Sequence, residues 1–272
     1  MNKCSLTIIM LTLNEEYHLQ DAINNIKDIA DHIFIVDSFS DDKTTEIAKR
    51  NQIKFVQRGF KNFGDQWNYA LENNPFDTRW VMKMDPDERL TEQLKSDIRS
   101  VMKLDNSETA YEFQRRLWFM REPMHVFNNV LRLWKKGTCE FSDVLVNEHP
   151  IIDGSVGFLK GKMEHFDSKD LHHWQEKQNK YTTMEAKMMY DKKALAAKPN
   201  IFGNKLEKRM FLKKILFKVP FKFTILFLYN LFITGAWKDG KLGWRWAQLR
   251  VYVYRMRQLK FIEMQTLKIK IK

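Results

Sequence analysis

Residues 6–16 read LTIIMLTLNEE. The first seven residues are apolar or β-branched, a composition typical of a strand that is buried on both faces. A secretory signal peptide is the alternative interpretation. However, the apolar run is short, no small-residue cleavage site follows it, and Asn14, Glu15 and Glu16 end it. We therefore predict a buried strand over residues 6–12 with a polar cluster directly after it.

The same pattern recurs through residues 1–105. We expect further strands at residues 32–36, 54–56 and 79–84, and helices at residues 15–29, 42–50, 63–71 and 91–102. This alternation predicts an α/β fold, with a mainly parallel sheet flanked by helices. Asn14, Asp37 and Asp85 follow three of these strands. They should therefore meet at the carboxyl edge of the sheet, where open α/β sheets bind ligands.

The pattern changes from residue 110 onward. Residues 111–119 and 130–134 are expected to be strands of a mixed or antiparallel extension, and residues 168–195 a long helix. Residues 144–146 lead into the polar segment at residues 147–150. The two cysteines, Cys4 and Cys139, have neither disulfide-framework nor zinc spacing, which is consistent with a reducing compartment.

The excess of basic residues lies entirely in the C-terminal quarter. The chain carries a net charge of +12. Residues 201–272 hold 17 Lys and Arg against 3 Asp and Glu, a net of +14, whereas residues 1–200 hold 29 against 31, a net of −2. A nearly neutral body followed by a basic, aromatic tail suggests chemistry in the first part and anchoring in the second.

The tail contains the run FTILFLYNLFITGAW, residues 223–237. Its 15 residues are fewer than the about 20 that a membrane-spanning helix needs. We expect an amphipathic helical region on the membrane surface, with Trp237, Trp244 and Trp246 at headgroup depth and basic residues against anionic lipid. The alternative is a helical pair packed on the body. Nucleic-acid binding is disfavoured by the high apolar content.

Asp85-Pro86-Asp87-Glu88 places two carboxylates one residue apart after a strand. Such a pair can hold a hard divalent cation that bridges the two phosphates of a nucleotide diphosphate. The alternative is a solvated acidic turn, because a short motif of this kind is common.

Three further polar clusters lie at residues 12–16, 37–44 and 60–68. In the first two, helix capping is an alternative to ligand binding, and Ser40 or Asp41 is a candidate cap for the helix that follows. The third cluster begins a helix, where contacts to phosphate are favoured.

Taken in order, the four clusters resemble the bacterial family 2 glycosyltransferases with a GT-A fold, and most of all the lipopolysaccharide-core β-glucosyltransferase-like branch. That group carries a TLNEE start, a VDSxSxDxT turn, an FxNFGxQxN stretch and a DxDE loop. Here they correspond to residues 12–16, 37–44, 60–68 and 85–88. The resemblance extends over roughly residues 5–195 and is specific in order and spacing. One departure is Pro86, where Ala is usual.

The resemblance implies an inverting enzyme that moves a sugar from a nucleotide-diphosphate donor onto a lipid-linked, lipopolysaccharide or polysaccharide acceptor in cell-envelope glycan biosynthesis. Its expected place is the cytoplasmic face of the inner membrane. Residues 1–200 would form the catalytic domain, with a nucleotide-sugar half at 1–105 and an acceptor half at 106–200, and residues 201–272 the membrane-associating region. The implied nucleotide-sugar ligands are Thr12, Asn14, Glu15, Asp37, Asp41, Gln66, Asn68 and Asp85.

The resemblance also implies a divalent metal, Mn²⁺ or Mg²⁺. Asp87 and Asp85 would ligate it and His165 would complete the shell, although a lone histidine is more often structural. An inverting transfer needs a general base. Glu148 is the first candidate, because its segment resembles the family's V-H-E, with Asn147 in place of the His. Asp143 is the second candidate, and Glu148 could instead be a loop acid paired with a lysine.

Two other functions remain open from the sequence. One is a non-catalytic nucleotide- or lipid-binding module on the same fold. The other is a nucleotidyltransferase, which also uses paired carboxylates and a metal. That class normally has a Gly-rich, basic loop after the first strand, where this chain has Asn14, Glu15 and Glu16.

Overall fold

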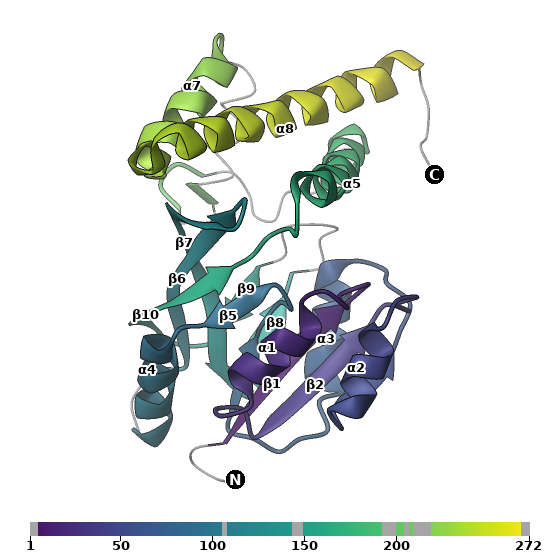
Figure 1. The fold of residues 1–272 in the computed structure, drawn as a ribbon, viewed down its shortest axis with the longest axis vertical. Coiled ribbons are helices and arrows are strands. Elements are labelled where there is room, and N and C mark those ends of the chain that lie inside the picture. Colours follow the sequence, from purple (N-terminus) through teal and green to yellow (C-terminus); the bar gives the residue numbers. More distant parts are fainter. Residues whose placement is uncertain are drawn as a thin grey trace.

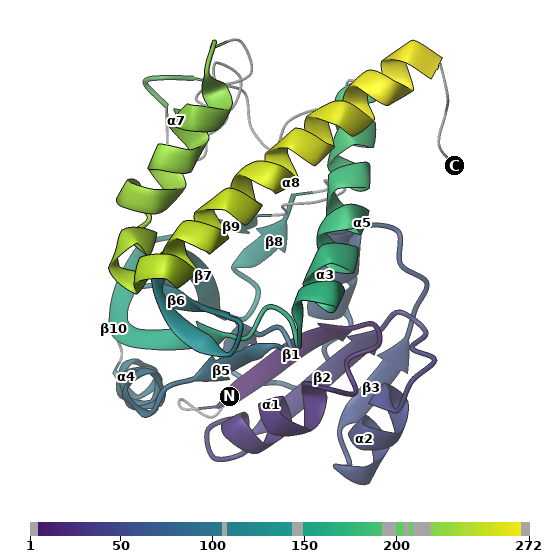
Figure 2. The same cartoon turned by 45° about the horizontal axis from the view of Figure 1, so that its top comes forward.

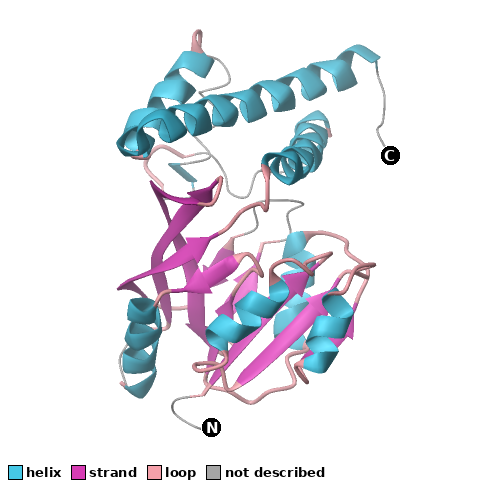
Figure 3. Cartoon of the chain, viewed as in Figure 1, coloured by secondary structure: helices cyan, strands magenta, loops and turns pink. Residues whose placement is uncertain are grey.

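The computed structural model describes residues 5–104, 108–142, 149–191, 200–203, 207–208 and 219–267. An eight-stranded sheet runs through these residues in the order β3-β2-β1-β4-β7-β6-β10-β5, and β8 and β9 form a separate pair. Figures 1 and 3 show helices on both sides of the large sheet, and the C-terminal helices beyond one end of it.

The strands are β1 (Leu6–Thr12), β2 (His32–Asp37), β3 (Lys54–Gln57), β4 (Trp80–Lys83), β5 (Glu88–Leu90), β6 (Ala110–Phe119), β7 (Glu122–Lys135), β8 (Cys139–Phe141), β9 (Pro150–Ile152) and β10 (Val156–His165). The helices are α1 (Leu19–Ile26), α2 (Thr44–Arg50), α3 (Phe63–Glu72), α4 (Glu92–Lys103), α5 (Leu171–Tyr190), α7 (Lys222–Leu228) and α8 (Gly240–Leu267). Short π-helical and 3₁₀ turns cover Tyr229–Ile233 and Ala236–Asp239.

The first half confirms the predicted α/β pattern. β1 pairs in parallel with β2 and β4, and β2 pairs in parallel with β3. Thr91 caps the N-terminus of α4, because its hydroxyl accepts a hydrogen bond from the Leu94 amide. The first helix begins at Leu19, later than expected, because the residues before it form a loop in which Asn14 has a left-handed φ of 57°.

Alternation along β1 divides the core into two layers. Leu6, Ile8 and Met10 pack with α1 and α4 on one face of the sheet, and Ile9 packs on the other face with Trp67 of α3. Successive side chains of a strand point to opposite faces, so a strand buried on both sides needs an apolar run. Burial on both faces therefore explains the apolar run of β1.

The second half extends the sheet in a mixed arrangement. β6 and β7 form a long antiparallel hairpin, and β10 then returns parallel to β6 and antiparallel to β5. β7 is much longer than the strand expected at residues 130–134, and β5 and β10 were not expected. In the β5–β10 pair, His165 lies opposite Glu88, so a distant segment reaches the Asp85–Glu88 loop.

The C-terminal segment does not form the single surface helix expected over residues 223–237. The chain turns at Gly235, whose φ is 91°, and a Cβ there would lie 2.6 Å from the carbonyl oxygen of His125. Leu231, Ala236 and Trp246 pack against the tip of the β6–β7 hairpin. Trp246, expected at headgroup depth, is therefore part of a buried cluster.

The long helix α8 also packs along α5, as Figure 2 shows. The ammonium of Lys260 donates to the backbone carbonyl and the side-chain oxygen of Asn179, and the Arg257 guanidinium pairs with Glu185 at 3.0 Å. α5 is thereby fixed to the C-terminal helices.

Within the described part of the chain, no helix is both long enough and apolar enough to cross a membrane. Residues 221–267, here called the α7–α8 segment, nevertheless have many large apolar side chains that are exposed to solvent. They include Phe221, Phe232, Ile233, Trp237 and Trp244. The boundary predicted at residues 200 and 201 adjoins segments outside the described residues, and it stays a prediction.

Candidate active site

The loops after β1 and β2 are joined at the carboxyl edge of the sheet. The Asn14 amide donates to Ser40 Oγ at 2.9 Å, and the Asp41 amide donates to Asn14 Oδ1 at 3.0 Å. The Glu15 amide donates to Thr44 Oγ1 at 2.8 Å. These bonds hold the loops in place without using the carboxylate of Glu15. The capping expected from Ser40 or Asp41 is not observed; the Asp42 carboxylate accepts from the Thr44 amide instead.

Asp37 is fully buried at the end of β2 and forms the centre of this arrangement. Its carboxylate accepts hydrogen bonds from Thr12 Oγ1 at 2.7 Å, from the amide and hydroxyl of Ser40 at 2.9 and 2.5 Å, and from Gln57 Nε2 at 3.0 Å. These donors occupy both carboxylate oxygens, so Asp37 shapes the loop that surrounds the edge. Its direct contact with a nucleotide stays a prediction.

The two predicted ligands on α3 already have protein partners. Gln66 Oε1 accepts from the Arg58 guanidinium at 2.7 Å, and its amide nitrogen lies 3.3 Å from Ser38 Oγ. The Phe141 amide donates to Asn68 Oδ1 at 2.7 Å, and Asn68 Nδ2 donates to the Phe141 carbonyl at 2.9 Å. These hydrogen bonds connect β8 to α3. A nucleotide role for either residue stays a prediction.

The loop between β4 and β5 is held by a buried acid. Glu88 Oε1 accepts from Arg115 at 2.9 Å and from Arg132 at 2.7 Å, while Oε2 accepts from the Asp85 amide at 2.9 Å. The Arg132 guanidinium also pairs with Asp85 Oδ2 at 2.8 Å. Burial opposes ionisation of Asp85, but the positive charges of Arg132, Lys83 and Arg115 together keep the pKa of that carboxyl below its usual range. The network fixes both ends of the loop.

Replacing Glu88 with Ala is expected to lower the free energy of unfolding by about 3 kcal/mol, because two arginines would lose their buried counter-charge. Urea denaturation midpoints measure the loss. The matched control is Glu92→Ala: this acid pairs with Lys95 but is 80% exposed, and the change should cost less than about 0.5 kcal/mol. Equal midpoints for the two variants would contradict the structural role of Glu88.

Asp87, His165 and Asp167 come together next to this network. One ligand atom from each lies within 4.8 Å of the other two. His165 Nε2 is 3.4 Å from Asp87 Oδ2 and 4.0 Å from Asp167 Oδ1. The Phe166 amide donates to the Asp87 carbonyl at 2.8 Å, which holds the two segments together. Lys177 of α5 completes the cluster, with its ammonium 3.2 Å from Asp87 Oδ2 and 3.1 Å from Asp167 Oδ1.

The charges of this cluster shift the ionisation of its members. Burial opposes ionisation of Asp87, but Lys177 and then His165 outweigh it and hold its pKa well below the ordinary value. Burial, followed by the negative charge of Asp87, raises the pKa of Glu15 to about 8. Burial lowers the pKa of His18 to about 4, so this imidazole is neutral near pH 7. The Glu15 carboxyl and the His18 ring therefore belong to the same electrostatic unit as Asp87.

The cluster fits a divalent cation. Asp87 Oδ1 is buried and has no hydrogen-bond partner among the described residues, so one carboxylate oxygen is available to a ligand. Two carboxylates and an imidazole suit Mn²⁺, and carboxylate oxygens suit Mg²⁺. Asp85 was predicted as a ligand but is not in this group, because its carboxylate is directed to Arg132. Asp167 takes its place.

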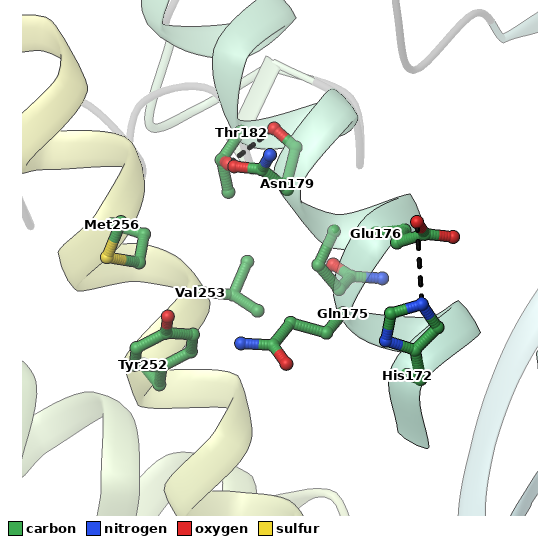
Figure 4. A pocket seen from close by; sticks show the side chains of 9 residues that line it. His172, Gln175, Glu176, Asn179, Thr182, Tyr252, Val253 and Met256 are labelled. Carbon is green, nitrogen blue, oxygen red and sulfur yellow. Dashed lines mark hydrogen bonds and ion pairs between the residues drawn. The ribbon is translucent and has the colours of Figure 1, made fainter. Parts of the chain in front are cut away.

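A separate hollow of about 250 Å³ lies between α5 and α8. Figure 4 shows Gln175 and Asn179 on one side of it and Tyr252, Val253 and Met256 on the other. None of the predicted site residues lines it. The hollow is therefore distinct from the carboxylate cluster.

Known glycosyltransferases are similar to this chain in sequence and in fold. Residues 7–116, less than half of the chain, match the model of glycosyl transferase family 2. An uncharacterized glycosyltransferase of Rickettsia typhi is 28% identical over 202 residues, which cover 69% of this chain and 68% of the relative. A second one, of Rickettsia conorii, is 26% identical over 205 residues, which cover 69% and 72%. These matches support glycosyl transferase family 2.

Among solved structures, the chain is similar to the mannosyltransferase PcManGT of Pyrobaculum calidifontis. The TM-score is 0.55 at 15% identity, over 94% of this chain and 86% of that one. The chain has a GT-A-like glycosyltransferase fold. The GT-A-like sheet explains why the polar clusters converge, since its first four strands present their carboxyl ends at one edge.

In this GT-A-like fold, six of the predicted residues lie at or after the carboxyl ends of β1, β2 and β4. They are Thr12, Asn14, Glu15, Asp37, Asp85 and Asp87. His165 joins them from the end of β10. The candidate general bases Asp143 and Glu148 lie outside the described residues, so their roles stay predictions.

Sequence reasoning missed Asp167, Lys177 and His18. Asp167 is two residues after His165, and this His-x-Asp spacing after a strand was an available signal. Lys177 had no such signal, because only the packing of α5 brings it to the loop. His18 is also unremarkable in the sequence, and its proximity to Asp87 is a result of the fold.

Proposed function

We propose that this chain is a metal-dependent glycosyltransferase that uses a nucleoside-diphosphate sugar as donor. The single observation that carries the proposal is the convergence of Asp87, His165 and Asp167 at the carboxyl edge of a GT-A-like sheet, with a buried Asp87 oxygen unpartnered among the described residues. The similar mannosyltransferase PcManGT was solved in complex with GDP-Man and Mn²⁺, which supports a donor and a metal of the same kinds here.

Each side chain then has a task. Asp87, His165 and Asp167 would hold the cation, whose charge stabilises the diphosphate leaving group as the glycosidic bond breaks. Thr12, Asn14, Asp37 and Asp41 would shape the nucleotide-binding loops, and Glu15 would lie beside the diphosphate. We propose an inverting transfer in which Glu148, or in second place Asp143, accepts the proton of the acceptor hydroxyl.

The acceptor that we propose is lipid-linked: a lipopolysaccharide or polysaccharide precursor of the cell envelope. Support comes from the sequence resemblance and from the α7–α8 segment. Phe232, Ile233 and Trp237 are exposed there, while Lys238 and Arg245 are exposed nearby along the chain. Apolar and basic side chains together suit the headgroup layer of an anionic membrane. We therefore propose a peripheral or monotopic place on the cytoplasmic face of the inner membrane.

This placement can be tested with vesicles that contain phosphatidylglycerol. High salt alone should release little protein, because apolar insertion is not screened. The variant with Phe232, Ile233 and Trp237 all changed to Ser should bind roughly tenfold more weakly in high salt, measured by co-sedimentation. The control changes Leu104 and Phe158 to Ser, since these side chains are exposed elsewhere on the molecule. Full release of the unmodified protein by salt, or equal binding of both variants, would contradict the proposal.

The proposed activity is tested by a donor screen. Purified protein is incubated with a panel of nucleoside-diphosphate sugars, Mn²⁺ and membrane extract as the acceptor source, and the released nucleoside diphosphate is measured. We expect release with at least one donor, dependence on the extract, loss with excess chelator and recovery on adding Mn²⁺ or Mg²⁺. Undiminished release in excess chelator would rule out the metal-dependent reaction. Nucleotide binding without release would favour a non-catalytic binding module.

A further inference from the structure

Lys177 places a positive charge inside the candidate metal site. Its ammonium lies 3.2 Å from Asp87 Oδ2, 3.1 Å from Asp167 Oδ1 and 3.0 Å from the Asp167 carbonyl oxygen. Two of these atoms belong to the carboxylates that, with His165, form the group able to hold a metal. The ammonium therefore contacts the atoms that a cation would use.

The surroundings explain why a cation is needed at this position. Asp87 is 7% exposed, and Asp167 is only partly exposed. Buried carboxylates are costly unless they are paired with a positive charge. Among the described residues, the Lys or Arg side chain that forms ion pairs with both acids is Lys177. Without the lysine or a metal, both carboxylates would lack a formal counter-charge.

The side chain of Lys177 can also move away from this position. α5 begins after Asp170, whose side chain caps the helix by accepting from the His173 amide at 2.7 Å. The far end of α5 is held by α8 through Arg257 and Lys260. The backbone of Lys177 is therefore fixed, while its flexible four-carbon stem is 27% exposed and can swing away. Asp87 Oδ1 is buried and has no hydrogen-bond partner among the described residues.

We propose that Lys177 is an internal counter-ion of the metal site and that it competes with the divalent cation for Asp87 and Asp167. Metal entry displaces the ammonium from both carboxylates. Lys177 thereby weakens metal binding and stabilises the metal-free protein. It is a positioning residue, and its role rests on the proposed function only in taking a divalent cation as the ligand of this site.

The test is a titration of the full chain with Mn²⁺ alone, in which free Mn²⁺ is measured by electron paramagnetic resonance. Lys177→Met keeps the length of the side chain and removes its charge. We expect this variant to bind Mn²⁺ roughly tenfold or more tightly than the unmodified protein. Lys180→Met is the matched control, because Lys180 is an exposed lysine on the same helix, and its affinity should not change. Unchanged or weaker binding by Lys177→Met would overturn the proposal.

A second measurement needs no variant and so does not depend on the folding of Lys177→Met. The unmodified protein is treated briefly with acetic anhydride, with and without Mn²⁺, and the acetylation of each lysine is measured by mass spectrometry. Mn²⁺ should increase acetylation of Lys177, because its ammonium loses its carboxylate partners, and should leave Lys180 unchanged. Equal or lower acetylation of Lys177 with bound Mn²⁺ would contradict the competition.

Asp87→Asn separates this inference from the proposed function. If Mn²⁺ binding is lost in Asp87→Asn but unchanged in Lys177→Met, the metal site stands and the competition is wrong. If Asp87→Asn binds Mn²⁺ like the unmodified protein, the metal is not held by Asp87, and the site and the competition both fail.

Discussion

Asp87→Ala is expected to lower kcat/KM for sugar transfer by roughly 10²-fold or more. The Asp87 carboxylate is the most buried member of the group formed with His165 and Asp167, and one of its oxygens has no partner among the described residues. Without it, the cation that neutralises the leaving diphosphate would lose its most buried ligand. Initial rates of nucleoside-diphosphate release, at several donor and Mn²⁺ concentrations, measure the loss.

The control for this change is Asp77→Ala. Asp77 is 71% exposed and lies 3.6 Å from Lys136, away from the cluster, so its loss should leave the rate nearly unchanged. Thermal melting of both variants checks that they are folded. If folded Asp87→Ala kept a rate within about threefold of the unmodified enzyme, the assigned role of this carboxylate would be wrong.

Glu148→Gln is expected to remove most of the transfer activity, by roughly 10²- to 10⁴-fold, while donor binding stays near normal. The amide keeps the shape of the side chain but cannot accept a proton from the acceptor hydroxyl. The prediction rests on the sequence, because residue 148 lies outside the described residues. Transfer rates and donor affinity, measured on the same preparation, separate lost chemistry from lost binding.

The competing assignment is tested by Asp143→Asn. If Glu148→Gln turns over normally while Asp143→Asn is inactive, the base is Asp143. If both variants turn over normally, neither acid is the base.

The fold of the first half follows closely from local sequence. β1 coincides with the predicted strand at residues 6–12. β2 and β3 are each one residue longer than predicted, and β4 is one residue shorter at each end. These strands are continuous apolar runs bounded by polar residues, so their pattern is local. The remaining strands were harder to predict. For example, β5 has three residues and acquires its place only by pairing with β10. Pairing between distant segments leaves no periodic signal in either one.

The site residues divide in the same way, into those that the sequence indicates and those that only tertiary packing brings to the site. Asp85 and Asp87 could be picked out because they follow a predicted strand, and His165 was implied by the family resemblance. The structure brings Asp87 and His165 within 3.4 Å. The opposite roles of the two aspartates could not be foreseen. Arg132 comes from near the C-terminal end of β7 and pairs with Asp85, while Lys177 comes from a helix and pairs with Asp87. These partners are set by tertiary packing.

The C-terminal segment is packed on the body in part, as one of the two interpretations expected, and its contact with a membrane stays a prediction. One side of it packs on the β6–β7 hairpin through Leu231 and Trp246, as a core would. Other side chains, such as Ile233 and Trp237, stay exposed. An apolar run alone cannot show which of its members face the body, because that depends on the turn at Gly235.

The central claim is that Asp87, His165 and Asp167 hold the cation of a nucleoside-diphosphate donor. Its most direct test is a crystal of the full chain grown with Mn²⁺ and a nucleoside diphosphate, with anomalous scattering recorded at the manganese edge. We predict an anomalous peak within coordination distance of Asp87, with the diphosphate bound to it at the carboxyl edge of β1 and β4 and the Lys177 ammonium displaced. Manganese and nucleotide bound elsewhere, for example in the hollow between α5 and α8, with the Asp87 cluster unchanged, would contradict the account.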